Sequence, residues 1–202
     1  EVEYHADQVF RVVEKDRHGT TRRVKTFSRD LGVVELKDES GRVLPQKLTL
    51  MTGIESGASQ VTQHRVSYNS DGFVTRVEFQ DPWGQPAGDP ESRYGEERVI
   101  DERGLLIERF DLGRDGERLR RKKGASGQRY EHNEHGAVIE AQHLDVDGTL
   151  CPGTDGVART ASSFDSSGNL IERVYFDVDG APVLNNGGVA RITWKYDARG
   201  NE

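Results

Sequence analysis

The stretch Trp194-Lys195-Tyr196-Asp197-Ala198-Arg199-Gly200-Asn201 predicts a strand followed by a tight turn, and it decides the fold because it recurs. Glycines occur at a spacing of 32 residues back along the chain, at Gly72, Gly104, Gly136, Gly168 and Gly200. Three residues before each glycine is an Asp or Asn, namely Asn69, Asp101, Asn133, Asp165 and Asp197. A fixed period of this length is the signature of a repeat protein.

The same turn pattern extends into the N-terminal third, where Gly19 and Gly41 are 22 residues apart. That short repeat is expected to lack a loop that the later repeats carry. A second glycine follows the first after twelve residues, at Gly53, Gly84, Gly116, Gly148 and Gly180, and one place later at Gly32. Glycine adopts a positive φ without steric cost, and Asp or Asn begins turns by bonding its own backbone, so both glycine series predict turns.

The segments between the turns have the composition of strands. Residues 170–176 are rich in β-branched and aromatic side chains, and apolar residues alternate with polar ones over 191–196. Each repeat is expected to contain a strand, a tight turn, a second strand, a second turn, a short strand such as 181–183 and a variable loop. No helix is expected, and the best candidate is one turn at Asp89-Pro90-Glu91.

The predicted fold is therefore all-β, an elongated stack of β-hairpin repeats with a period of about 32 residues that forms a twisted, repetitive antiparallel sheet. Equivalent positions carry similar apolar residues, for example Ile107, Ile139 and Ile171, as expected where each repeat packs against its neighbours. Residues 1–62 are interpreted as degenerate N-terminal β repeats or a cap. Residues 63–202 are interpreted as the regular repeats.

Composition limits the kinds of partner. Charged residues make up 31% of the chain, which predicts a thin core. The net charge is −7, which disfavours nucleic acid as the main partner. One cysteine excludes an internal disulfide framework, and no apolar run is long enough to span a membrane. A first residue other than Met and a last repeat that stops after its turn suggest a segment of a larger protein. The compartment stays open between cytoplasmic and exported or cell-surface.

Two turn sequences carry a resemblance to a known family. Tyr196-Asp197-Ala198-Arg199-Gly200-Asn201 and Phe164-Asp165-Ser166-Ser167-Gly168-Asn169 resemble the bacterial YD-repeat (RHS-like) proteins, and the similarity extends loosely over residues 9–202. The period here is longer than in that family, and Tyr-Asp itself occurs only at the last turn. MORN-like hairpin repeats are a second resemblance.

Both resemblances imply stacked β-hairpins with a scaffold or binding role, and neither supplies catalytic residues. The YD-repeat resemblance further implies large sheets or hollow shells in surface-exposed or exported bacterial proteins, some of which carry toxin domains.

Three groups of residues have the composition of chemical sites. His132, His135, His143 and Cys151 could ligate zinc, but His132, His143 and Cys151 take aromatic or apolar positions of the repeat, and His135 is a turn residue. The Asp-x-Asp-Gly turns at 145–148 and 177–180 lack the late acidic ligand of a calcium loop, although stacked acidic turns could share a cation. Glu108, Glu140 and Glu172 are expected on a solvated outer face with cross-strand ion pairs. No catalytic, cofactor-binding or metal-binding residue is therefore expected.

Specificity is expected where repeats differ. Trp83 occupies the position of Asp115, Asp147 and Asp179, and it either anchors a partner or folds back on the sheet. Basic residues gather between Arg118 and Lys123, which is typical of a solvated loop and less often of a partner site. The candidate partner-binding residues are Trp83, Tyr94, Arg118, Arg120 and Arg121.

The favoured hypothesis is a non-catalytic scaffold that binds a protein partner or adjoining domains of its parent protein. The alternatives are a segment of an RHS-like shell enclosing a toxin or effector domain, a substrate or regulated partner of another enzyme with residues 119–128 exposed, and an enzyme using the His/Cys group or the glutamates.

Overall fold

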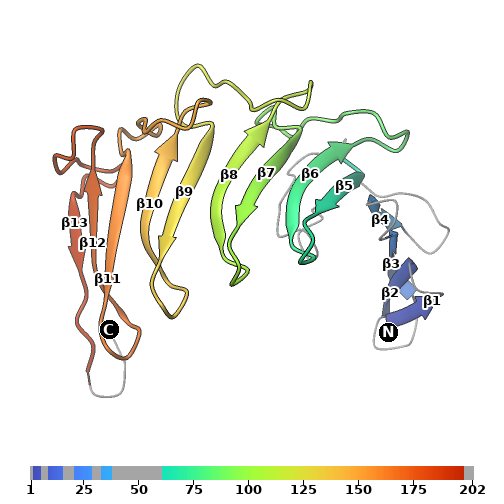
Figure 1. Ribbon diagram of the computed structural model, residues 1–202, viewed down its shortest axis with the longest axis horizontal. Coiled ribbons are helices and arrows are strands. Elements are labelled where there is room, and N and C mark those ends of the chain that lie inside the picture. Colours follow the sequence, from blue (N-terminus) through green and yellow to red (C-terminus); the bar gives the residue numbers. More distant parts are fainter. Residues whose placement is uncertain (1, 6–8, 16–20, 29–32, 38–60, 198–202) are drawn as a thin grey trace. The chain divides into compact units, whose positions relative to one another are not determined.

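The computed structural model describes residues 2–5, 9–15, 21–28, 33–37 and 61–197, and every regular element in these ranges is a β-strand (Figure 1). Four strands precede residue 38: β1 (Val2–His5), β2 (Val9–Lys15), β3 (Thr21–Ser28) and β4 (Val33–Lys37). Nine follow: β5 (Gln63–Tyr68), β6 (Val74–Gln80), β7 (Gly95–Ile100), β8 (Leu106–Leu112), β9 (Gly127–His132), β10 (Val138–Leu144), β11 (Arg159–Phe164), β12 (Leu170–Phe176) and β13 (Arg191–Thr193). The predicted all-β fold is confirmed.

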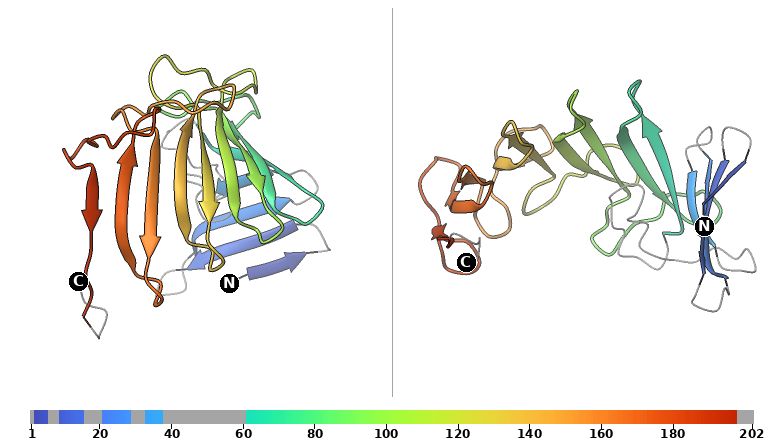
Figure 2. Two further views of the ribbon diagram at one scale, coloured as in Figure 1. Left: turned by 60° about the vertical axis from the view of Figure 1, so that its left-hand side comes forward. Right: turned by 90° about the horizontal axis from the view of Figure 1, so that it is seen from below.

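The strands pair in chain order, each with the next one along the sequence, and every recorded pairing is antiparallel. The described chain divides into two compact units. The first unit comprises Glu1–Glu97 and Asp111–Glu117, and the second comprises Arg98–Phe110 and Arg118–Glu202. Within the second unit, strands β9 to β12 lie side by side (Figure 2). This is the predicted stack of β-hairpin repeats.

Turns of one construction recur at up to three places in each 32-residue repeat. The first turn is closed by a bond from the glycine N–H to the carbonyl of the Asp or Asn three residues earlier, at 3.0–3.1 Å in four copies. The side-chain oxygen of that Asp or Asn also accepts the N–H groups two and four residues later, as Asp101 does from Arg103 (3.0 Å) and Leu105 (2.8 Å). The second turn uses the same bonds, for example at Asp81 and Asp177.

The structure contains a third turn that the sequence-based repeat did not include. Its last residue comes eight residues after the glycine of the second turn. Its last position has a positive φ in every described copy: 62° at Ser92, 78° at Gly124, 83° at Gly156 and 73° at Gly188. Asp89 and Asn185 begin two of these turns and accept the same pair of backbone N–H groups. The expected variable loop is therefore also a closed turn at 89–92, 153–156 and 185–188. In the first of these, Ser92 takes the position that glycine has in the others.

The core is thin, as the composition predicts. Along β6, buried Val77 and Phe79 alternate with half-exposed Arg76 and Glu78, so one face of this strand is apolar. His64 is fully buried in β5 and stacks on Phe79, with 4.9 Å between ring centroids. The remaining buried apolar side chains among the described residues are Val61, Val66, Ala87, Phe110, Leu112, Leu144, Val157 and Ala158.

Two local predictions are wrong. Residues 89–91 form part of a turn and not a helical turn, because Asp89 bonds backbone N–H groups ahead of it. The expected short strand at 181–183 is a single bridge between Phe176 and Pro182, and proline has no N–H with which to extend a ladder. The turn glycines Gly19, Gly32, Gly41, Gly53 and Gly200 lie outside the described residues.

Candidate partner-binding site

Trp83 is the most exposed large apolar side chain among the described residues, with 81% of its surface accessible. It lies in the second turn of the first regular repeat, which Gly84 N–H closes onto the Asp81 carbonyl at 3.1 Å. The Asp81 carboxylate also accepts the N–H groups of Trp83 and Gln85, both at 2.9 Å. Trp83 therefore does not fold back on the sheet. Its side chain is exposed, and its turn is held by several backbone hydrogen bonds.

A hollow of about 240 Å³ lies next to this turn, within the first unit. It is lined by residues of strands β5, β6 and β8, by the second turns of two successive repeats and by Tyr94, which precedes β7: Arg65, Glu78, Phe79, Gln80, Gly84, Pro86, Tyr94, Leu112, Gly113, Arg114, Asp115 and Gly116. Gly84, which directly follows Trp83, forms part of the rim. The turn that carries Trp83 therefore adjoins the hollow, and we call this turn and the hollow together the Trp83 surface.

Tyr94 forms one wall of the hollow and is held from both sides. Its N–H donates to the Leu112 carbonyl and its carbonyl accepts from Phe79 N–H, both at 2.8 Å. A Cβ at Gly88 would lie 2.9 Å from the Tyr94 ring, so only glycine leaves room for this ring position. Tyr94 was predicted as a binding residue, and it lies at the Trp83 surface.

The four charged groups of the hollow differ in their partners. Glu78 accepts a hydrogen bond from Arg76, which does not line the hollow, at 3.3 Å. Arg76 also donates to the Gly116 carbonyl, and its Nη1 lies 3.7 Å from Glu97 Oε2. The Asp115 carboxylate accepts the N–H of Glu117 at 3.1 Å. The guanidinium groups of Arg65 and Arg114, by contrast, have no hydrogen bond or ion pair with any described residue, and both residues are exposed.

An ion-pair cluster fixes the loop that follows the hollow. Arg93 Nε lies 2.7 Å from Asp89 Oδ2, and Arg93 Nη1 lies 3.8 Å from Asp111 Oδ1. Burial disfavours the charged guanidinium, but the hydrogen bond and charge of Asp89 outweigh it and raise the pKa of Arg93. Because the Asp89 side chain is 1% exposed, this pair anchors the third turn against β8.

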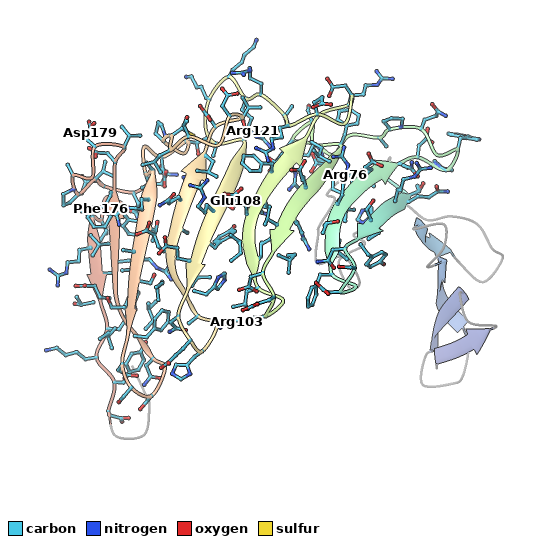
Figure 3. All side chains as sticks on the ribbon, in the orientation of Figure 1. Arg76, Arg103, Glu108, Arg121, Phe176 and Asp179 are labelled. Carbon is cyan, nitrogen blue, oxygen red and sulfur yellow. The ribbon has the colours of Figure 1, made fainter. Side chains whose placement is uncertain are left out.

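The predicted basic residues belong to the second unit and are not a single free patch. Arg118 stacks over Phe110 at 3.6 Å from the ring centroid, and Arg120 Nη2 lies 3.7 Å from Asp147 Oδ2 with both side chains exposed. Figure 3 shows Arg121 at the end of the hairpins opposite Arg103, which donates to the carbonyls of Asn133 and Glu134 in the next first turn. Arg118 therefore packs on the sheet.

The expected cross-strand ion pairs are present at 32-residue spacing in the second unit. Glu108 pairs with Arg129 at 2.6 Å, Glu140 with Arg159 at 2.8 Å, and Glu172 with Arg191. The glutamate side chains are 20–28% exposed, so the expected ion pairs lie on a half-exposed face. The repeated carboxylates bind arginines of the neighbouring strands.

The His/Cys group does not converge in the structure. His143 Nδ1 lies 2.8 Å from the Val157 carbonyl, and exposed His135 lies 3.3 Å from Glu134. Cys151 is partly covered, and burial raises the pKa of its thiol. In the part of the chain that the structure describes, no three His, Cys, Asp or Glu side chains are arranged to hold a metal ion.

The acidic turns use their carboxylates internally. Asp145 accepts the hydroxyl and the N–H of Thr149, which lowers the pKa of Asp145. Asp165 likewise accepts the side chain and the N–H of Asn169, and its pKa is lowered. These oxygens are therefore occupied by hydrogen bonds that close the turns.

Arg65 and Arg114 are the residues of the Trp83 surface that the sequence interpretation missed. A comparison of repeats contains a signal for Arg114, because Val146 and Val178 occupy its position in the next two repeats. Arg65 has no such signal, since the equivalent position of another repeat also carries an arginine, Arg129.

Comparison with solved structures finds similar chains, among them the two that follow. No protein-family model matches the chain, and no curated protein matches it. The structure resembles a chain in "Crystal Structure of TcdB2-TccC3-TEV" with a TM-score of 0.30 and 15% identity, covering 99% of this chain and 11% of that one. It also resembles a chain of the Photorhabdus luminescens Tc holotoxin pore with a TccC3 mutation. The TM-score is 0.29 and the identity 10%, and the match covers 98% of this chain and 10% of that one. The chain thus spans about a tenth of their length. The described residues contain no helix of the length and hydropathy needed to span a membrane.

Proposed function

We propose that this chain is a non-catalytic β-hairpin repeat module that acts as a protein-interaction scaffold within a larger protein. The observation that carries the proposal is the 81% exposed Trp83, held on a bonded turn where the other regular repeats have aspartate. Exposed aromatic side chains beside a hollow are common anchors of protein interfaces. Stacked repeats also provide extended binding surfaces.

The non-catalytic assignment follows from how the acidic residues are used. Catalysis needs a carboxylate whose environment differs from that of its copies. Glu108, Glu140 and Glu172 instead pair with arginines in the same way in three consecutive repeats. This uniformity favours a structural role for them.

Peptide display tests the proposal. A random-peptide library would be selected on the immobilised whole chain and, in parallel, on a Trp83→Asp variant, which carries the residue found in the other repeats. We expect peptide sequences that are enriched on the original chain and lost on the variant. Circular dichroism of both proteins confirms that the variant is folded. Enrichment that is equal on both proteins would show that the Trp83 surface is not the binding site.

A second candidate is a wall segment of an RHS-like shell. The recurring turns favour it, because repeats that are built alike can each add further strands to the same sheet. Electron microscopy of the full-length protein that carries this chain tests the idea. A hollow particle supports it, and an extended, open particle counts against it.

A further inference from the structure

We propose that the hollow of the Trp83 surface binds an acidic side chain of a protein partner, with Arg65 and Arg114 supplying the positive charge. This inference rests on the proposed function and specifies the chemistry of the partner. In this arrangement the carboxylate enters the hollow and an apolar neighbour in the partner covers the Trp83 indole.

The charges of the hollow favour an anion. Glu78 is paired with Arg76, so the charges that remain are two arginines and one carboxylate, Asp115, which accepts the Glu117 N–H; their sum is positive. Its two exposed arginines, Arg65 and Arg114, have no partner among the described residues. An arriving carboxylate therefore gains charge-assisted hydrogen bonds without displacing an existing ion pair.

The size of the hollow favours a side chain over a whole ligand. Its volume of about 240 Å³ is below the roughly 300–1,000 Å³ of small-molecule sites. Tyr94, Pro86 and Leu112 give it apolar walls for the methylene groups of a glutamate or aspartate. The exposed Trp83 lies beside Gly84 on its rim and offers a surface for the adjacent partner residue.

A protein partner fits these features better than a nucleic acid. Phosphate backbones are bound by a row of basic residues on a basic surface. This chain has a net charge of −7, and the hollow offers two arginines beside two carboxylates. Two guanidinium groups match a single carboxylate and not a polyanion.

A fluorescence titration tests the inference. In a Trp194→Phe background Trp83 is the sole tryptophan, because the chain has two. The probe is a short synthetic peptide of glutamate and leucine, compared with the same peptide carrying glutamine for glutamate. We expect the glutamate peptide to shift the Trp83 emission and to bind about tenfold more tightly than the glutamine peptide. Calorimetry on the unmodified chain gives the same comparison without the Trp194 substitution.

Variants of the arginines complete the test. Arg65→Gln combined with Arg114→Gln is expected to weaken binding of the glutamate peptide about tenfold. The matched control combines Lys122→Gln and Lys123→Gln, which removes the same charge from an exposed loop of the second unit. Its affinity is expected to stay within about twofold of the unmodified chain, since separated surface charges are screened by salt. Circular dichroism checks that each variant is folded.

The failing outcomes separate the two proposals. Equal binding of both peptides, no binding of the glutamate peptide, or an equal effect of the lysine and arginine variants overturns the acidic-partner inference. The proposed function survives these results if displayed peptides still depend on Trp83, and it fails at this surface if they do not. Arginine-dependent binding of a thymidine oligonucleotide in preference to the peptide would contradict the protein class of partner.

Discussion

His64 makes the stability of the first unit depend on pH. The ring is fully buried against Phe79, and burial lowers the pKa of His64 from 6.5 to about 4. The unfolded chain therefore binds a proton more readily than the folded chain between these two values. Stability is fully present above pH 6.5 and decreases as the pH falls toward 4. The complete shift corresponds to about 3 kcal/mol, of which about 2 kcal/mol is lost between about pH 8 and about pH 5.

Urea unfolding of the original chain and of a His64→Leu variant, at about pH 8 and about pH 5, measures this loss. The variant removes the titrating ring but keeps an apolar side chain against Phe79. Asp145 and Asp165 have lowered pKa values, so their contribution is complete above their usual 3.8 and does not change over this range. We expect the original chain to lose about 2 kcal/mol more than the variant. An equal loss in both proteins would refute the assignment to His64.

Four further substitutions test the turns, the sheet and the exposed anchor. Ser92→Gly is expected to raise the free energy of unfolding by about 1 kcal/mol in urea titrations, because Ser92 has a φ of 62° where the other copies have glycine. Gly127→Ala is expected to lower it by about 1–3 kcal/mol in calorimetry, since a Cβ there would lie 2.5 Å from a backbone carbonyl of the paired strand. A double-mutant cycle of Glu140→Gln and Arg159→Gln should give a coupling of about 0.5–1 kcal/mol that decreases with salt. Trp83→Asp should change stability by less than about 0.5 kcal/mol, and a larger loss would mean that the exposed indole packs in the fold.

Much of the fold could be predicted because its turns have strict backbone requirements. Glycine is the residue that most readily adopts a positive φ, and Gly72, Gly104, Gly136 and Gly168 have φ values of 82–84°. Their spacing therefore locates the hairpins. The third turn was missed because its four copies differ in sequence: their first positions are Asp89, Arg121, Gly153 and Asn185, and one copy ends in Ser92.

The candidate site was harder to predict because it depends on packing between strands distant in sequence. Arg65 lies in β5 and Arg114 follows β8, and only the folded sheet brings them to one hollow. The exposure of Trp83 likewise follows from the packing of its turn and not from its residue type. The ion pairs of Glu108 and its copies could be predicted, because arginines follow at the matching position of the adjacent strand.

The pairing of each strand with the next one along the chain bears on how this protein is made. Every hydrogen-bonded ladder joins segments that leave the ribosome in succession, so a hairpin can form before the following one is synthesised. The connections within hairpins are short, for example 69–73 between β5 and β6, and short connections reduce the entropy lost on closure, which favours rapid folding of each hairpin. Growth by addition of one hairpin at a time would let repeats be gained or lost during evolution without redesign of a central core.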